Sequence, residues 1–131
     1  METNTGTPRK RHVLIVDDEV ALAWSLKQIL EARGYLGTIV PDGGLALKFV
    51  MDHPLDAVVC DLESAQLEGD LLFATVERMN PSLARRFLFI TGEKDPAPFK
   101  RFLDASGLHK LQKPVGVEQI FGEVQRLVES L

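Results

Sequence analysis

The fold is decided by the stretch Ala57-Val58-Val59-Cys60-Asp61, in which four small or branched apolar residues are followed directly by an acid. Such an unbroken apolar run predicts a strand that is buried on both faces, as in parallel sheets. Asp61 then stands where the strand leaves the core, at the edge where open α/β sheets bind their ligands. An isolated aspartate is more often a turn or cap residue, so the meaning of Asp61 depends on how the other strands end.

Four further apolar runs predict strands, and segments with helical character separate them. Gly34 and Gly107 are placed to close helices in the left-handed conformation, and Asp42 is placed to cap one. His53 and Asn80 each precede a proline, which predicts that a helix ends there. The predicted strands cover residues 12–16, 36–40, 57–60, 87–90 and 108–112, and the predicted helices cover 20–33, 45–52, 70–79, 97–105 and 117–130.

This alternation of strands and helices predicts the architecture. Strands joined by helical crossovers run parallel, and their continuous apolar sequences require cover on both faces. We therefore expect an α/β protein, a three-layer α/β/α sandwich with a five-stranded parallel sheet. Right-handed crossovers and one reversal of strand order would bring several carboxyl ends of strands around one crevice.

Composition limits the classes of protein to consider. A chain of 131 residues that is 45% hydrophobic and 26% charged fits one globular domain, and we assign residues 12–131 to it, after a flexible segment of residues 1–11. No apolar run approaches the roughly 20 residues that cross a bilayer, and the polar N-terminus has no secretion signal. A net charge of −4 gives no basis for nucleic-acid binding. We expect a soluble, cytoplasmic protein without a membrane or nucleic-acid partner.

Polar residues follow four of the five predicted strands, namely Asp17-Asp18, Asp61, Thr91 and Lys113. Three carboxylates that meet at one edge repel one another, and a single lysine would not satisfy them all. A divalent cation would, and oxygen ligands without histidine or cysteine favour Mg²⁺ or Mn²⁺. Such an ion is often bound together with a phosphate group, which indicates phosphoryl chemistry.

Asp61 is the best candidate nucleophile at this edge, because a carboxylate can attack a phosphoryl group and form an acyl phosphate. The metal ion, the Lys113 ammonium and the Thr91 hydroxyl would then hold the phosphoryl oxygens. The residues alone thus predict a phosphoryl-accepting site.

The same residues resemble the receiver domain of two-component response regulators. The resemblance rests on residues 14–19 (Leu-Ile-Val-Asp-Asp-Glu), Asp61, Thr91-Gly92 and Lys113-Pro114, and it extends over residues 12–131. It implies the flavodoxin-like (βα)5 topology with strand order 2-1-3-4-5. It also implies a signalling domain rather than an enzyme, which accepts a phosphoryl group from the phosphohistidine of a histidine kinase or a phosphotransfer protein.

The resemblance also assigns roles to single residues. Asp61 corresponds to the phosphoacceptor. Asp18 and Asp61 correspond to direct Mg²⁺ ligands, Asp17 to a ligand through water, and Glu63 to the position whose backbone carbonyl binds the metal. Thr91 and Lys113 correspond to the groups that bind phosphoryl oxygens, and the Lys113-Pro114 peptide is expected to be cis.

One residue departs from the family at a position that bears on signalling. Receivers usually carry Tyr or Phe three residues before the lysine, whereas this chain has Lys110. We interpret Lys110 as an exposed residue on an edge strand, and this departure keeps open a second function, a receiver-like interaction module that works without phosphate.

Output is expected through protein contact, by a stand-alone receiver, by an intermediate of a phosphorelay, or by the receiver module of a hybrid sensor kinase. The resemblance also allows a homodimer through the helix 4, strand 5 and helix 5 face, which corresponds here to residues 97–105, 108–112 and 117–130.

Overall fold

The computed structural model describes residues 9–62, 69–92 and 107–130. Five strands form one parallel sheet in the order β3-β2-β4-β5-β6, which is 2-1-3-4-5 when the strands are numbered along the chain. The predicted fold class and strand order are therefore confirmed. The strands are β2 (His12–Val16), β3 (Leu36–Val40), β4 (Ala57–Asp61), β5 (Phe87–Thr91) and β6 (His109–Gln112).

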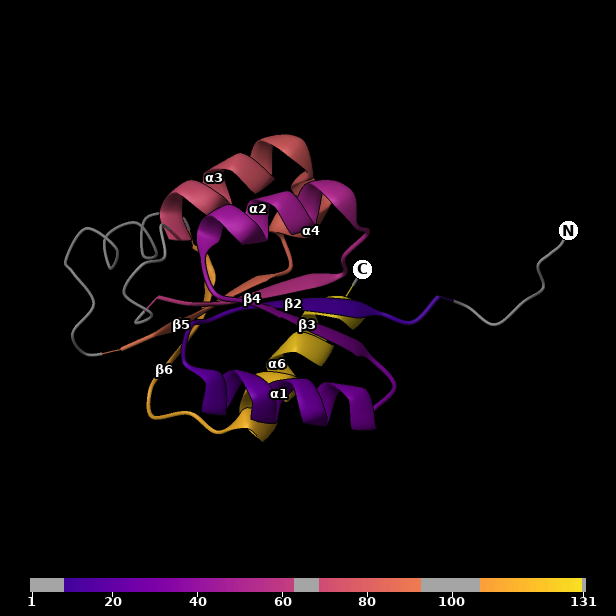
Figure 1. The fold of residues 1–131 in the computed structure, drawn as a ribbon, viewed down its shortest axis with the longest axis vertical. Coiled ribbons are helices and arrows are strands. Elements are labelled where there is room, and N and C mark those ends of the chain that lie inside the picture. The colour runs from indigo at the N-terminus through magenta and orange to yellow at the C-terminus, as the bar shows by residue number, and fades with distance from the viewer. Residues whose placement is uncertain (1–8, 63–68, 93–106, 131) are drawn as a thin grey trace, which may run out of the picture.

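Helices cover both faces of the sheet (Figure 1). One face carries α2, α3 and α4, and the other carries α1 and α6. Each layer of helices packs on its own apolar cluster, because the strands present buried side chains to both faces. The helices are α1 (Val20–Ala32), α2 (Gly43–Asp52), α3 (Gly69–Met79), α4 (Pro81–Ala84) and α6 (Val117–Glu129).

Local sequence signals account for several of these boundaries. Gly34, which follows α1, has φ of 89°, as predicted for a residue that closes a helix. The Asp42 carboxylate accepts a hydrogen bond of 2.9 Å from the Leu45 backbone N–H and so caps α2. His53 is the C-cap of that helix, as the following proline predicts.

The short helix α4 was not predicted from the sequence. The prediction that α3 ends before Asn80-Pro81 is correct, but a new turn of helix begins immediately. The Asn80 side chain accepts a hydrogen bond of 3.1 Å from the Leu83 N–H, and Pro81 occupies the first turn. A proline that ends one helix also favours the first position of the next, and only the capping residue before it reveals the second role.

The predicted helix over residues 97–105 lies outside the described residues, and so does most of the predicted N-terminal segment. The dimer face expected from the family resemblance is therefore described only in part, through β6 and α6. None of the described helices has the length and apolar character needed to cross a bilayer.

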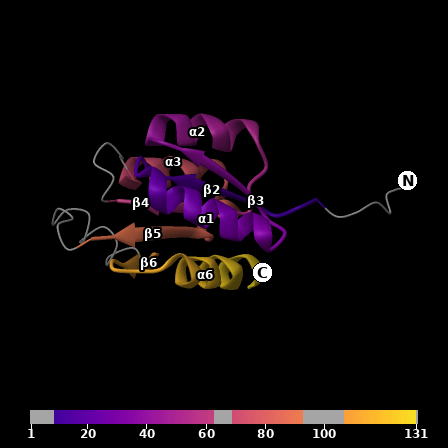
Figure 2. The same ribbon diagram turned by 60° about the horizontal axis from the view of Figure 1, so that its bottom comes forward.

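The two ends of the sheet differ in what they carry. The carboxyl ends of the strands lie together at one end of the molecule, and the last turn of α6 lies at the other end with the amino ends of the strands (Figure 2). The predicted site residues follow the carboxyl ends, as expected for an open parallel sheet.

Candidate functional site

The sheet register places Asp17 and Asp61 at neighbouring positions. Val16 of β2 pairs with Cys60 of β4, so each acid follows one member of this pair on strands that lie about 4.8 Å apart. Both residues also border a small void of about 10 Å³, whose other walls are apolar core residues. Asp17 is 4% exposed and Asp61 is 2% exposed, so both carboxylates are buried, where a charge requires compensation by another charge or by hydrogen bonds.

Lys113 provides a positive charge at this edge. Its Nζ lies 2.9 Å from the Asp61 Oδ2, and the two side chains are 22% and 3% exposed. Lys113 comes directly after β6, and its backbone N–H donates to the Thr91 carbonyl at 2.8 Å, which extends the pairing of β5 and β6. The Lys113-Pro114 peptide is cis, as the resemblance predicted. The structure thus brings together residues 52 positions apart in the sequence (113 minus 61).

Thr91 is the last residue of β5 and is 7% exposed. Ile90 pairs with Asp61, which places Thr91 one position beyond the acid on the adjacent strand. The Thr91 hydroxyl donates to the Leu111 carbonyl at 3.4 Å, near the long limit for a hydrogen bond. The hydroxyl is therefore held toward β6 by a weak contact.

The adjacent acids Asp17 and Asp18 lie in different environments. The Asp17 Oδ1 accepts a hydrogen bond of 2.8 Å from the Glu19 N–H, and the Asp17 N–H donates to the Val40 carbonyl at 3.0 Å. These contacts fix the turn between β2 and α1. Asp18 is exposed. The pair therefore offers one buried carboxylate and one at the surface of the same turn.

A metal site at this edge would use oxygen ligands only. No three His, Cys, Asp or Glu side chains within residues 9–62, 69–92 and 107–130 are grouped closely enough to form a metal cluster by themselves. The fourth predicted ligand, the Glu63 carbonyl, lies outside these ranges. The donor chemistry nevertheless fits a hard cation, because the buried carboxylates of Asp17 and Asp61 follow paired residues of neighbouring strands and Mg²⁺ typically keeps several water ligands.

Cys60 lies immediately below the site and belongs to the core. Its side chain is fully buried, and burial together with the neighbouring Asp61 and Asp17 carboxylates raises the pKa of its thiol far above the usual value. A thiol in this environment stays protonated and has no part in nucleophilic chemistry. The prediction of a buried core cysteine is confirmed.

Lys110 lies on β6, which is an edge strand of the sheet, and its side chain is exposed. It pairs in register with Phe89 of β5. The prediction of an exposed lysine on an edge strand is confirmed, and this position offers no ring to fill an apolar pocket.

Asp56, which was not among the predicted site residues, lies just before β4 and contacts several residues at the other end of the sheet. No spacing or motif marked this residue. Its contacts come from segments that are far apart in the chain, so only the folded structure could identify it.

Comparison with known proteins agrees with this geometry. Residues 13–125 match the sequence profile described as the response regulator receiver domain. The chain superposes on a CheY-like receiver domain protein from Methanospirillum hungatei JF-1 with a TM-score of 0.81 at 24% identity, covering 93% of this chain and 96% of that one. A signal receiver domain from Pseudomonas fluorescens Pf-5 gives a TM-score of 0.79 at 21% identity, covering 95% and 91% of the two chains.

Curated relatives are similar over the same region. The transcriptional regulatory protein ZraR of Escherichia coli K12 is 24% identical over 114 residues, which are 87% of this chain and 25% of ZraR. The response regulator MprA of Mycobacterium sp. KMS is 28% identical over 116 residues, which are 88% of this chain and 50% of MprA. This chain thus spans a quarter to a half of the length of these relatives. The match to the family profile covers most of the chain, which therefore belongs to the response regulator receiver domain family.

Proposed function

We propose that Asp61 accepts a phosphoryl group from the phosphohistidine of a histidine kinase or a phosphotransfer protein, and that the chain then signals through contacts with other proteins. The observation that carries this proposal is the ion pair of 2.9 Å between the Lys113 Nζ and the buried Asp61 Oδ2, beside a second buried acid, Asp17. This arrangement combines a nucleophile, Asp61, with a fixed positive charge, Lys113, and phosphoryl transfer needs both from a protein.

The reaction balances without any further reactant. A carboxylate oxygen of Asp61 forms a bond to phosphorus while the bond between phosphorus and the donor imidazole nitrogen breaks. The electron pair of the broken bond stays on the imidazole, which leaves as the neutral ring after any proton exchange with water. Lys113 balances part of the negative charge on the phosphoryl oxygens, and burial of Asp61 limits access of water to the acyl phosphate.

Mg²⁺ or Mn²⁺ completes the site in this proposal and supplies charge neutralisation on the phosphoryl oxygens. Asp18 and Asp61 would bind the ion directly, Asp17 would bind it through water, and the Glu63 backbone carbonyl would be the remaining protein ligand. The exposed position of Asp18 and the buried positions of the other two acids are compatible with an ion bound at the surface of this edge.

Thr91 is proposed to couple phosphorylation to a change of conformation. Its hydroxyl is held toward the Leu111 carbonyl by a contact of only 3.4 Å, so a stronger hydrogen bond to a phosphoryl oxygen on Asp61 would draw it away from β6. A shift at β6 would alter the surface that β6 and α6 present to a partner or to a second copy of the chain. Because Lys110 is exposed on β6, we expect the readout to proceed without an inward-turning aromatic ring.

The test is phosphorylation by a small donor. Purified protein is incubated with acetyl phosphate in buffer containing Mg²⁺ or EDTA, and the intact mass is measured at intervals. We expect a mass gain of one phosphoryl group only with Mg²⁺, and no gain in Asp61→Asn. Asp52→Asn, which changes an exposed acid at the end of α2, serves as the matched control and should be phosphorylated like the wild type.

Phosphorylation that persists in Asp61→Asn, or that is independent of Mg²⁺, would contradict this proposal. A folded wild-type protein that gains no mass from acetyl phosphate or from a phosphorylated histidine kinase would favour the second candidate function, an interaction module that works without phosphate. The observation that favours this second candidate is the exposed Lys110 at the position of the usual aromatic residue.

A further inference from the structure

A basic cavity lies at the end of the sheet opposite to the proposed phosphorylation site. It has a volume of about 460 Å³ and is lined by Arg9, Arg11, Asp56, Arg86, Val128 and Glu129. Asp56 precedes β4 and Asp61 ends it, so about 16 Å of extended strand separates this cavity from the proposed phosphoacceptor. The two sites therefore share a strand but no side chain.

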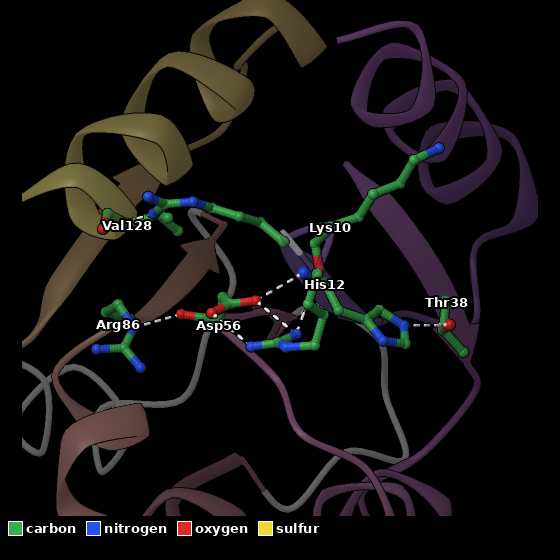
Figure 3. Close-up of polar contacts among 8 residues, drawn as sticks. Lys10, His12, Thr38, Asp56, Arg86 and Val128 are labelled. Carbon is green, nitrogen blue, oxygen red and sulfur yellow. Dashed lines mark hydrogen bonds and ion pairs between the residues drawn. The ribbon is translucent and has the colours of Figure 1, made fainter. Parts of the chain in front are cut away.

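Asp56 organises the arginines around this cavity. Its two carboxylate oxygens accept hydrogen bonds of 3.2 Å each from the Arg9 guanidinium, and one of them also accepts a bond of 2.8 Å from the His12 backbone N–H. The Asp56 carbonyl accepts a hydrogen bond from the Arg86 Nε. Figure 3 shows Asp56 between Arg86 on one side and His12 with Thr38 on the other. Three segments of the chain are thus joined at one acid.

The guanidinium groups of Arg11 and Arg86 are held by neutral acceptors. The Arg11 Nη1 donates to the Val128 carbonyl at 3.0 Å, and the Arg86 Nη1 donates to the Ser82 hydroxyl at 3.2 Å. Within the part of the chain that the structure describes, the Nη2 of each arginine makes no hydrogen bond. Each side chain is therefore fixed in place while part of its fork remains available to a ligand.

Charge in this cavity is positive overall. The lining has three arginines and only two acids, Asp56 and Glu129, although the whole chain carries a net charge of −4. Arg86 is 8% exposed, and burial lowers the pKa of its guanidinium; Asp56 opposes this effect, and the nearby Arg85 and Arg11 add to it to a smaller extent. A buried cation of this kind gains most from an anionic partner.

Arg86 also lines a second cavity, which has a volume of about 540 Å³. Its walls combine the apolar residues Phe73, Leu108 and Leu127 with charged residues that include Glu77, Arg85 and Arg126. Cavities of this size hold small molecules, and aromatic and aliphatic walls favour an apolar body. The shared Arg86 thus has a basic cavity on one side and a partly apolar cavity on the other, which suits a ligand with an anionic head and an apolar or aromatic part.

We propose that the Arg9, Arg11 and Arg86 cavity binds the phosphate group of a small phosphorylated molecule, whose apolar part reaches past Arg86 into the second cavity beside Phe73. Arginine forks match the geometry of phosphate oxygens and can bind them with two parallel hydrogen bonds. Binding there would tie the amino end of β4 to α6 through Arg11 and Val128. Phosphate binding in this cavity does not depend on phosphorylation of Asp61. The proposed phosphoacceptor function and the proposed binding site can therefore fail independently.

The test uses phenyl phosphate and inorganic phosphate as probes. Each is titrated into the ¹⁵N-labelled protein in low-salt buffer with EDTA, which prevents metal-dependent transfer to Asp61, and amide and arginine side-chain signals are followed by NMR. We expect saturable shifts at residues 9–12, 56, 86 and 128, with unchanged signals at Asp17 and Asp61, and tighter binding of phenyl phosphate than of inorganic phosphate.

Variants then test which arginines bind. Arg11→Gln is expected to weaken the binding of phenyl phosphate by about tenfold, as for loss of one charge-assisted hydrogen bond. Arg9→Gln changes an exposed side chain and is expected to weaken binding without loss of folding, which circular dichroism verifies. Arg86→Lys keeps the charge but loses the fork, and it should also weaken binding. Arg78→Gln, an exposed arginine of α3, is the matched control and should bind normally.

Three outcomes would overturn the proposal. The first is the absence of saturable shifts at this end of the sheet. The second is equal weakening by Arg11→Gln and by the control Arg78→Gln, which would indicate a general charge effect. The third is a protein that does not bind phenyl phosphate but cosediments with vesicles that contain phosphatidate and not with pure phosphatidylcholine vesicles. This result would assign the cavity to the headgroup of a membrane lipid instead of a small molecule.

Discussion

Side chains of the same type take different roles in this chain because their surroundings differ. Asp17 is buried and holds the turn after β2 through the Glu19 N–H, whereas Asp18, the next residue, is exposed. Asp61 pairs with Lys113, and Asp56, which directly precedes the same strand, binds Arg9. At this scale the chemistry of a carboxylate is set by burial and by the cation that it meets.

His12 shows the same dependence on surroundings for a residue that titrates near neutral pH. Its Nε2 lies 2.8 Å from the Thr38 hydroxyl, and its ring packs edge-on against Phe49 with centroids 5.6 Å apart. Burial, then the nearby His53 and Arg9, hold the pKa of His12 below its usual 6.5 despite Asp56. The folded protein therefore binds this proton at a lower pH than the unfolded chain does.

The sign of the resulting pH dependence follows from linkage. Because the unfolded chain gains the proton first as the pH falls, the free energy of unfolding should decrease from about pH 7.5 to about pH 5.5. We expect this decrease to be smaller in His12→Gln, as measured by urea unfolding at several pH values. Identical slopes in His12→Gln and the wild type would show that His12 has no part in it.

The elements that surround the site are packed closely at the carboxyl end of β4. Gly69 begins α3, and a Cβ at this position would collide with the Leu62 Cδ2 and lie 3.5 Å from both the Cys60 Sγ and the Phe89 ring. All three neighbouring side chains are buried, so none can move away freely. The approach of α3 to the sheet next to Asp61 therefore depends on a glycine.

Two alanine substitutions test this packing. Gly69→Ala is expected to lower the free energy of unfolding by about 1–2 kcal/mol through overpacking. Gly122→Ala, in the interior of α6, is the matched control, because a Cβ there meets no described atom within 4 Å. This second change should raise the free energy of unfolding by up to about 1 kcal/mol, since alanine favours helices over glycine. Urea unfolding measures both, and a stabilising Gly69→Ala would refute the close approach.

On the scale of the whole molecule, the sheet holds two separate sets of charged residues at its two ends. The carboxyl ends of the strands carry the buried acids with Lys113, and the amino ends carry the arginines around Asp56. The parallel arrangement produces this separation, because every strand runs in the same direction between the same two ends. One end is therefore suited to a cation and the other to an anion.

Metal binding at the acidic end should stabilise the whole fold. If Mg²⁺ binds the folded chain only, a concentration of about ten times its Kd raises the free energy of unfolding by about 1.4 kcal/mol. We expect this gain in thermal or urea unfolding of the wild type and of Asp52→Asn, but a much smaller gain in Asp61→Asn. Sodium chloride at matched ionic strength is the reference, and equal effects of the two salts would contradict a specific metal site.

The sequence by itself determined the order of elements and the residues that end the strands. Apolar runs such as 57–60 are local signals. The position of Asp61 or Thr91 could be predicted because each residue directly follows such a run along the chain and ends its strand. The family resemblance added the strand order and the cis peptide at Lys113-Pro114, both of which the structure shows. These features could be predicted because each depends on a few consecutive residues or on a motif shared with known receivers.

Only the tertiary structure decided which charged groups meet. The pairing of Val16 with Cys60 places Asp17 next to Asp61, and the packing of β6 on β5 brings Lys113 into an ion pair with Asp61. The contacts of Asp56 with Arg9 and Arg86, and the helix at Pro81–Ala84, had no predicted counterpart. Hydrophobic periodicity specifies which face of an element is buried, but contacts between polar side chains depend on positions set by the packing of the whole chain.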